Sequence, residues 1–327
     1  MFVKNSPPHT IEEEKLEVTL RPLQWNDYIG QEKLKGNLRI IMEAAKQRRE
    51  PLEHLLFYGN SGLGKTSLAQ VLAREMETAL RRTTGPVLER AADIASVLTN
   101  LGEKEILFID EIHRIGKTAV ETLYSAMEDF RLHLLLGRGP MARTMDLQLP
   151  RFTLIGATTR ISLLPPPFRN RFGAVFQLGF YEQQDMKQII QRSAGILGVK
   201  IEEEALGVIA ARSRFTPRVA NRLLKRVRDF AMVDAQEIIS KDMAQKALGF
   251  LGIDELGLEE SDRKIFETII STFSGGPVGI EALAAATGEE IETILDIYEP
   301  YLLQLGFLER TRQGRIVTRR AYQHLKK

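Results

Sequence analysis

The stretch FYGNSGLGKTSLAQ, residues 57–70, decides the fold that the sequence predicts. It fits the pattern G-x-x-x-x-G-K-[ST] from Gly59 to Thr66, between a short apolar strand (HLLFY, 54–58) and a segment of helical periodicity (TSLAQVLAREM, 66–76). Glycines let backbone N–H groups approach phosphate oxygens closely, and a helix that begins there adds its positive end. The strand–loop–helix order therefore predicts a nucleotide site, although a glycine turn can match so short a pattern by chance.

Two adjacent acidic residues supply the second half of the predicted site. The segment EILFIDEIH, residues 105–113, is an apolar strand that ends in Asp110 and Glu111. Strands of a parallel sheet are apolar on both faces, and ligands bind at their carboxyl ends. We expect Lys65 to reach the β- and γ-phosphates of ATP, Thr66 and Asp110 to hold Mg²⁺, and Glu111 to activate the attacking water. A solvated acidic strand end is the alternative.

A third strand is predicted at RFTLIGATTR, residues 151–160. It ends in Thr158 and Thr159, and a hydroxyl at the tip of a strand beside the acidic one can contact the attacking water or the γ-phosphate. The sequence does not choose between the two threonines. Standing alone, the segment would favour a threonine-rich loop.

Two arginines are candidates for contacts to the transferring phosphate. Arg171 lies in the proline-rich connection LLPPPFRNRFG, where a guanidinium on a subunit surface can stabilise charge on a neighbour's ATP. Arg218 follows a proline at a predicted helix start, and it could reach the nucleotide from a second domain. A plain surface arginine is the alternative for each.

The composition excludes several classes of protein. The 327 residues carry 45 Lys and Arg against 43 Asp and Glu, so any nucleic-acid contact must come from a local patch. One patch runs from Arg310 to Lys327, with seven Lys or Arg and no Asp or Glu. The chain has no cysteine, its start resembles neither a signal nor a transit peptide, and no apolar run is long enough to span a membrane. We therefore expect a cytoplasmic protein without disulfides or thiolate metal sites.

Two smaller domains are predicted beyond the third strand. Residues 182–254 carry apolar residues at three- and four-residue spacing, which predicts helices. After about residue 255, three predicted helices and the hairpin TRQGRIVT are typical of a winged helix. Arg310 and Arg315 at this hairpin, with Arg312 as the weaker candidate, are expected to contact the DNA backbone, which carries little sequence information. A solvated basic tail is the alternative.

The order of these features resembles an AAA+ ATPase, in which a P-loop parallel-sheet domain of the α/β class is followed by a small helical lid. More narrowly, LRPLQWNDYIGQ, LFIDEIHRI, FTLIGATTR, GGPVG and EPYLLQLGFLERT resemble the RuvB family of bacterial Holliday-junction branch-migration motors. The resemblance implies a large ATPase domain at residues 1–181, a lid at 182–254 and a winged-helix head at 255–327. The loop GNSGLGKT departs from the family, which usually has two prolines after the first glycine.

The resemblance also implies which residues bind and hydrolyse ATP. Arg171 would be an arginine finger acting on a neighbour's ATP, and Arg218 would be the sensor in the lid. The phosphates would be bound by Gly62, Lys65, Thr66 and Ser67. The adenine side would be lined by Leu20, Arg21 and Tyr181, with Glu128, Asp129 and Phe130 nearby in the nucleotide-contact set.

Function and partners follow from the same resemblance. It implies a hexameric ring on duplex DNA that is loaded by RuvA at four-way junctions and migrates the branch point in recombination, DNA repair and the SOS response. RuvC, a junction nuclease, would join the resolving complex. An inserted hairpin at about 130–150 would dock onto RuvA through the apolar residues Leu134, Leu136, Met145 and Leu147. A hairpin that belongs to the core is the alternative.

Three other functions fit part of the pattern. DEIH also fits a DEAH-type helicase, but such enzymes need two ATPase-like lobes and the chain has one phosphate loop. A clamp-loader-like AAA+ switch leaves the basic winged helix unexplained. A DNA-binding regulator that only senses nucleotide would not need Glu111.

Overall fold

The computed structural model describes residues 18–136 and 143–325, and the chain divides into two compact units. The first, here called the sheet unit, comprises residues 21–59 and 63–179. Of the described residues, the second, the helical unit, comprises 18–20, 60–62 and 180–325. The helical unit thus contains both the predicted lid and the predicted winged helix.

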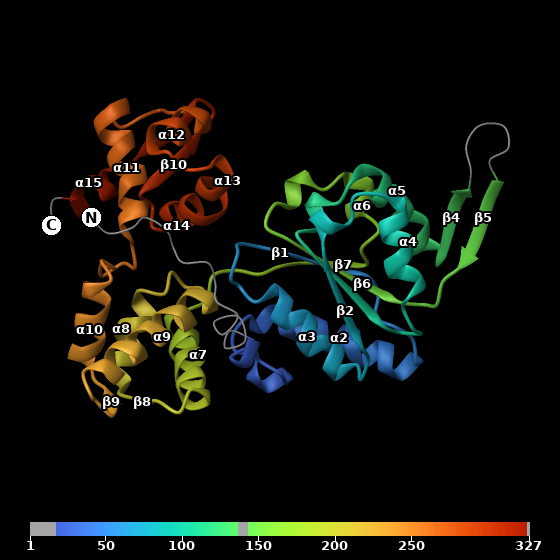
Figure 1. The fold of residues 1–327 in the computed structure, drawn as a ribbon, viewed down its shortest axis with the longest axis horizontal. Helices are drawn as coiled ribbons and strands as arrows, with labels where there is room; N and C mark the ends of the chain where they lie inside the picture. The colour runs from blue at the N-terminus through green and yellow to red at the C-terminus, as the bar shows by residue number, and fades with distance from the viewer. Residues whose placement is uncertain (1–17, 137–142, 326–327) are drawn as a thin grey trace. The chain divides into compact units, whose positions relative to one another are not determined.

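A five-stranded parallel sheet forms the centre of the sheet unit (Figure 1), in the order β2–β3–β6–β1–β7. The strands are β1 (Leu55–Tyr58), β2 (Leu80–Thr84), β3 (Ile106–Asp110), β6 (Thr153–Thr158) and β7 (Ala174–Gln177). The three central strands are buried along almost their whole length, which explains their continuous apolar sequences. β6 pairs with both β1 and β3, so the sheet places the threonine strand beside the acidic strand, as predicted.

Helices cover both faces of this sheet. Figure 1 shows α2 and α3 on one side and α4 and α5 on the other. The helices are α2 (Glu32–Arg48), α3 (Lys65–Glu75), α4 (Ala91–Thr99), α5 (Lys117–Glu128) and α6 (Pro166–Arg169), with 3-10 turns at Trp25–Asp27, Gly85–Val87, Ile112–Arg114 and Ile161–Leu163. The core between the sheet and α5 includes Leu107, Leu123 and Leu154, all fully buried. The α/β P-loop architecture predicted from the sequence is therefore confirmed.

The inserted hairpin consists of β4 (Arg131–Leu136) and β5 (Arg143–Gln148), which pair in antiparallel fashion. Figure 1 shows it extending away from the parallel sheet. At its base, Leu132 is buried and Leu147 packs partly against the core. Leu147 was expected to belong to an exposed apolar tip, and it does not. Farther out, Met145 is 42% exposed and lies opposite Leu134 in the ladder. The side chains of Leu134 and Leu136 lie outside the described residues.

The first part of the helical unit contains four helices and a two-stranded ladder. These are α7 (Gln183–Ile196), β8 (Lys200–Ile201), α8 (Glu203–Ala211), α9 (Pro217–Val233), β9 (Ile238–Ile239) and α10 (Lys241–Phe250). Pro217 begins α9 because a helix's first residue needs no N–H partner within the helix. Ala220, Leu224 and Val227 form the buried stripe of this helix, in keeping with the spacing seen in the sequence.

The second part of the helical unit is the winged helix. Its elements are α11 (Glu260–Phe273), α12 (Ile280–Thr287), α13 (Ile291–Thr293), α14 (Glu299–Gln304), β10 (Leu308–Thr311), β11 (Gly314–Val317) and α15 (Arg319–Leu325). The segment predicted as the third helix is helical from Ile291 to Gln304, with a π-helical turn at Ile294–Tyr298 between α13 and α14. Pro300 explains this turn, since it has no N–H to donate to the carbonyl four residues earlier.

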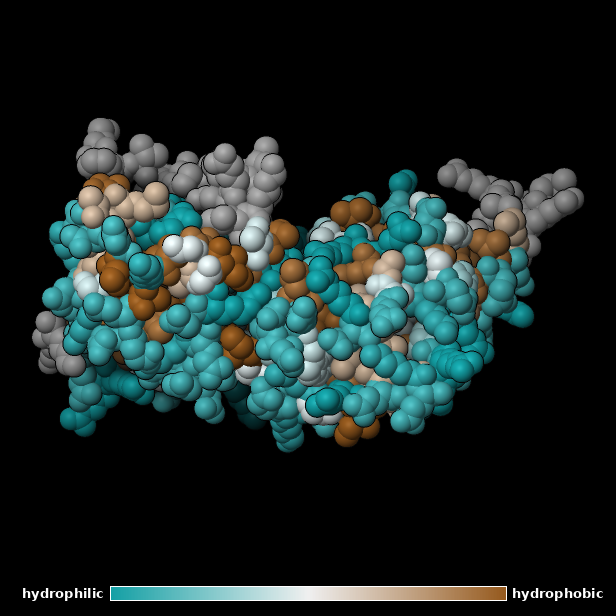
Figure 2. Space-filling model, turned by 90° about the horizontal axis from the view of Figure 1, so that it is seen from below, coloured by the Kyte–Doolittle hydropathy of each residue, from teal (hydrophilic) through white to brown (hydrophobic). Residues whose placement is uncertain are grey.

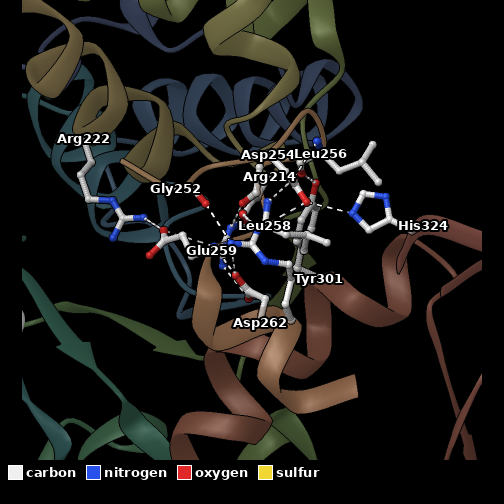
Figure 3. A network of polar contacts seen from close by, with 12 residues as sticks. Arg214, Arg222, Gly252, Asp254, Leu256, Leu258, Glu259, Asp262, Tyr301 and His324 are labelled. Carbon is white, nitrogen blue, oxygen red and sulfur yellow. Dashed lines mark hydrogen bonds and ion pairs between the residues drawn. The ribbon is translucent and has the colours of Figure 1, made fainter. Parts of the chain in front are cut away.

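A network of polar contacts joins the two parts of the helical unit (Figure 3). Arg214, just before α9, donates to both carboxylate oxygens of Asp262 on α11, at 3.1 and 2.6 Å. Its Nε donates to the Gly257 carbonyl at 2.9 Å, and its second amino group is 3.2 Å from Glu259. On the other side, Arg263 of α11 donates to the Gly252 carbonyl at 3.1 Å, so side chains from both parts hold residues 252–257.

The surface of the described residues is that of an ordinary globular protein. None of the described helices is both long enough and apolar enough to span a bilayer. Figure 2 shows a face on which hydrophilic residues predominate and hydrophobic residues lie in small groups. Scattered apolar side chains of this kind are common on folded proteins and need no special explanation.

Candidate active site

The glycine-rich loop runs from the end of β1 into α3. Gly59, Gly62 and Gly64 have φ angles of 146°, 80° and 97°, which residues with a Cβ adopt only with strain. A Cβ on Gly59 would also lie 2.4 Å from the carbonyl oxygen of Leu178. The tight path of the loop therefore requires the glycines that the sequence pattern predicts.

A lysine, a threonine and an aspartate meet around this loop. The Lys65 side chain folds back so that its Nζ donates to the Gly59 carbonyl at 2.8 Å. Thr66 Oγ1 donates to Asp110 Oδ2 at 3.3 Å, which joins the start of α3 to the end of β3. Ser67 follows on the first turn of α3 and is partly exposed. The contact between Thr66 and Asp110 gathers a hydroxyl and a carboxylate at the carboxyl edge of the sheet.

Thr66 and Asp110 supply only two oxygens. That number suits Mg²⁺ bound together with a nucleotide better than it suits a metal ion bound by protein side chains alone. Within residues 18–136 and 143–325, no three His, Asp or Glu side chains cluster so that they could hold a metal. Mg²⁺ commonly takes one or two protein oxygens and completes its shell with phosphate and water. Thr66 and Asp110 would supply such a pair beside a bound nucleotide.

The structure gives the two candidate threonines different environments. Thr158 is fully buried, and its Oγ1 lies 2.9 Å from Nδ1 of His113 and accepts the backbone N–H of Arg160. Thr159 is partly exposed, and its Oγ1 donates to Glu111 Oε2 at 3.5 Å. Thr159 is thus the better placed of the two to contact a phosphate or a water. His113, which the sequence analysis did not single out, lies between Glu111 and the buried threonine.

Glu128, Asp129 and Phe130 lie at the edge of the sheet opposite the phosphate loop. The Phe130 ring centroid is 6.1 Å from that of His54 and 5.7 Å from that of Phe152. These two residues directly precede β1 and β6, and parallel strands all begin at one edge of a sheet. The three residues are therefore remote from the phosphates of their own subunit, which corrects the expectation that they lie near its adenine side.

Arg171 lies at this same amino-terminal edge. It precedes β7, whose first residue pairs with the first residue of β1. Its guanidinium is 3.0 Å from Glu128, donates to the Pro167 carbonyl at 2.7 Å, and lies 4.2 Å from the ring centroid of Tyr124. These contacts hold Arg171 in place at the edge of the sheet opposite the phosphate loop.

The remaining predicted nucleotide residues are divided between the two units. Leu20 and Tyr181 are buried in the helical unit, and Arg21 belongs to the sheet unit. Arg218 lies on the first turn of α9, where its backbone N–H donates to the Gly62 carbonyl at 3.4 Å. Both residues belong to the helical unit, so this hydrogen bond is made within that unit.

The three wing arginines differ in their availability to DNA. Arg310 and Arg315 both pair with the Glu299 carboxylate, at N–O distances of 2.8–3.2 Å. Glu299 is 1% exposed and Arg315 is 9% exposed, so this pair is buried and ties the wing to α14. Arg312 is exposed in the turn between β10 and β11. Arg315 is therefore less accessible than expected, and Arg312 is more exposed than Arg315.

Replacing Arg312 and Arg315 separately by alanine tests this difference. We expect Arg312→Ala to weaken duplex binding at all sequences and to reduce the salt dependence of log K by about 1, without a change in stability. Arg315→Ala should instead lower the free energy of unfolding by about 1–3 kcal/mol, because it removes a hydrogen-bonded partner of a buried carboxylate. Fluorescence anisotropy over a salt series and urea unfolding give the two quantities. An unchanged salt slope for Arg312→Ala would contradict its assignment.

Comparisons with known proteins agree from residue 20 to residue 326. Residues 20–178 match the family model of the Holliday junction DNA helicase RuvB P-loop domain. Residues 181–254 match the RuvB AAA lid domain, and residues 255–326 match the RuvB C-terminal winged helix domain. The three matches follow one another in the order predicted for the ATPase domain, the lid and the head.

Individual relatives are similar over nearly their full length. The chain is 55% identical to the Holliday junction branch migration complex subunit RuvB of Dehalococcoides mccartyi, over 95% of this chain and 89% of that one. It is 54% identical to the corresponding subunit of Chloroflexus aurantiacus, over 97% and 91%. The solved structure of the Thermotoga maritima RuvB Holliday junction branch migration motor superposes with a TM-score of 0.87 at 49% identity, covering 94% of this chain and 98% of the other.

Proposed function

Since the chain belongs to the RuvB family, we propose that it is a bacterial DNA motor that hydrolyses ATP to drive Holliday-junction branch migration in recombination and repair. The proposal includes a hexameric ring on duplex DNA, loading by RuvA, RuvC in the resolving complex and a cytoplasmic location. The observation that carries it is the 3.3 Å contact between Thr66 and Asp110. That contact joins the phosphate loop to the acidic strand at the edge where α/β proteins bind ligands.

In the proposed site, the chain's own groups divide the work of phosphoryl transfer. The loop N–H groups, Lys65 and Ser67 would bind the phosphates. Thr66 and Asp110 would hold Mg²⁺, which would supply positive charge to the transferring phosphoryl group. Glu111 orients the attacking water and accepts its proton. Thr159, which donates to Glu111 at 3.5 Å, contacts the γ-phosphate or that water.

The opposite edge of the sheet would serve the ATP of a neighbour. Arg171 would stabilise charge on the transferring phosphoryl group there, with Glu128, Asp129 and Phe130 beside it. Arg218 would contact the nucleotide of its own subunit from the start of α9. The assignment of Arg171 to a neighbour's ATP is supported by its position before β7, at the amino-terminal edge of the sheet.

Two further contacts belong to the proposal. The hairpin β4–β5 would bind RuvA, with Met145 as its exposed apolar side chain. Arg312 and Arg310 would bind the DNA backbone, Arg310 through a side chain that stays 55% exposed beside Glu299. The domain boundaries at 181/182 and 254/255 complete the proposed organisation.

The function is tested by measuring ATP turnover and the migration of a labelled four-way junction with the full-length protein and its junction-binding partner. We expect Glu111→Gln to lower turnover about 100-fold or more while keeping ATP affinity, because it removes the base but no phosphate contact. Glu121→Gln, which changes an exposed acid on α5, should leave turnover unchanged. A wild-type protein that consumes no ATP would refute the proposal, and one that consumes ATP without moving junctions would be a switch and not a motor.

A further inference from the structure

A buried imidazole lies directly behind the proposed general base. His113 Nδ1 is 3.2 Å from Glu111 Oε2 and 2.9 Å from Thr158 Oγ1. The His113 side chain is 6% exposed, whereas the Glu111 side chain is 36% exposed. His113 therefore connects a carboxylate that faces solvent to a hydroxyl buried at the end of β6.

The chemistry of these atoms determines where the imidazole carries a proton. An ionised carboxylate oxygen only accepts hydrogen bonds, so an Nδ1 atom with a lone pair would repel Glu111 at this distance. The Thr158 hydroxyl already accepts the N–H of Arg160 at 2.9 Å and has a second lone pair to offer. The contacts are satisfied together when Nδ1 is protonated and its N–H is shared between Glu111 and Thr158.

The backbone of Glu111 is fixed, but its side chain needs a separate restraint. Glu111 has a φ angle of 47°, and a Cβ on Gly85 would lie 2.2 Å from the Glu111 carbonyl oxygen, so the two backbones are in close contact. These features hold the peptide units and leave the three side-chain torsions free. A glutamate loses much rotamer freedom when it is held in one orientation, so a positioned base requires partners for its carboxylate. His113 and Thr159 are such partners.

We propose that His113 is a positioning residue that holds the Glu111 carboxylate through its Nδ1–H and links it to Thr158 on β6. The inference rests on the proposed ATP hydrolysis, in which Glu111 orients the attacking water. It gives the end of β6 two connections to Glu111: Thr159 directly, and Thr158 through the imidazole. A shift of this strand end on phosphate binding or release would then reorient the base.

Asparagine and glutamine variants separate positioning from packing. The side-chain amide nitrogen of asparagine can occupy the place of Nδ1, whereas that of glutamine reaches the place of Nε2. We expect His113→Ala and His113→Gln to lower kcat about 10- to 100-fold with KM for ATP and nucleotide affinity unchanged, as is typical when a supporting hydrogen bond is lost. His113→Asn should retain kcat within about threefold of the wild-type value, because it restores the donor.

A spectroscopic measurement tests the same contact without turnover. The chain has five histidines, so selective ¹⁵N-histidine labelling with the His113→Asn variant assigns the resonances of His113. We expect the nucleotide-free protein to show a protonated Nδ1 at this residue. We also expect Glu111→Gln to change its chemical shift, because the hydrogen bond then goes to a neutral amide. An Nδ1 without a proton would overturn the inference.

The outcomes distinguish this inference from the proposed function. If the wild-type protein hydrolyses no ATP, the proposed function fails. The ¹⁵N measurement of the His113 tautomer would then still show whether His113 holds Glu111. If the wild type is active and His113→Ala matches it, the positioning role is wrong. If the asparagine and glutamine variants lose kcat, ATP affinity and thermal stability equally, His113 is only part of the core, and the inference is again overturned.

Discussion

Replacing Arg171 with alanine is expected to lower ATP turnover by about 10³-fold or more while ATP affinity stays unchanged, as is usual for an arginine finger. The physical reason is the position of Arg171 at the amino-terminal edge of the sheet, held by Glu128 and the Pro167 carbonyl. The loop that binds the subunit's own phosphates lies at the carboxyl edge. Under the proposed function, the variant would lose a contact to the transition state on a neighbour's ATP and would keep every contact to its own ATP.

Mixing two inactive variants tests whether the contact is made between subunits. Arg171→Ala supplies an intact loop and base, and Glu111→Gln supplies an intact finger. When equal amounts are combined at random, roughly a quarter of the pockets in a ring receive both, so activity should reappear. Arg151→Ala, which changes an exposed arginine near the same edge, is the matched control and should remain active. A mixture that stays inactive would show that the finger does not act in trans.

Replacing Arg214 with alanine is expected to lower the free energy of unfolding by about 3–5 kcal/mol, the cost of leaving a buried charge without its partner. Asp262 is fully buried, and Arg214 donates to both of its carboxylate oxygens. Arg214 and Phe215 also have φ angles of 54° and 51°, a left-handed conformation that needs such support. Urea unfolding of the full-length protein gives the free energy.

The deficit of the Arg214→Ala variant should depend on pH. Burial raises the pKa of the Asp262 carboxyl, and the Arg214 guanidinium opposes that rise. Without the arginine the folded-state pKa rises further above its unfolded value, so the variant is relatively most stable at acidic pH. The loss of unfolding free energy in the variant, relative to the wild type, should therefore grow as the pH rises through the pKa of Asp262 in the folded variant.

Two further variants check that the buried pair is responsible. The double variant Arg214→Met with Asp262→Leu removes both charges and should recover most of the lost stability. Arg222→Ala removes the half-exposed arginine that pairs with Glu259 and should cost less than about 1 kcal/mol. A single Arg214→Ala variant as stable as the wild type at neutral pH would show that the ion pair contributes nothing.

The central architecture could be predicted because its signals are local. The loop needs glycines at defined positions, and an apolar run that ends in Asp110 and Glu111 predicts β3. Parallel pairing then brings the ends of β1, β3 and β6 to one edge of the sheet. Together these rules predict from the sequence alone that Lys65, Thr66 and the two acids lie at the same edge of the sheet.

Other features depend on contacts between residues that are distant in sequence. In the sequence, Arg315 resembles an exposed wing residue. In the structure it is buried and donates a hydrogen bond to Glu299, which lies on another element. Arg214 meets Asp262 only through the fold, because neither segment has a local pattern that indicates the other. His113 lies in the DEIH motif, yet its proposed role depends on Thr158, a residue of a neighbouring strand.

The separation of Arg171 from its own loop has a consequence for stoichiometry. If each pocket is completed by the next subunit, the association is head-to-tail, and a two-fold dimer that pairs like edges completes no pocket. An open arc always has one idle pocket at its terminus, so its output per subunit is lower than that of a closed assembly. Closure itself would then act as the switch for full activity, without any additional regulatory domain.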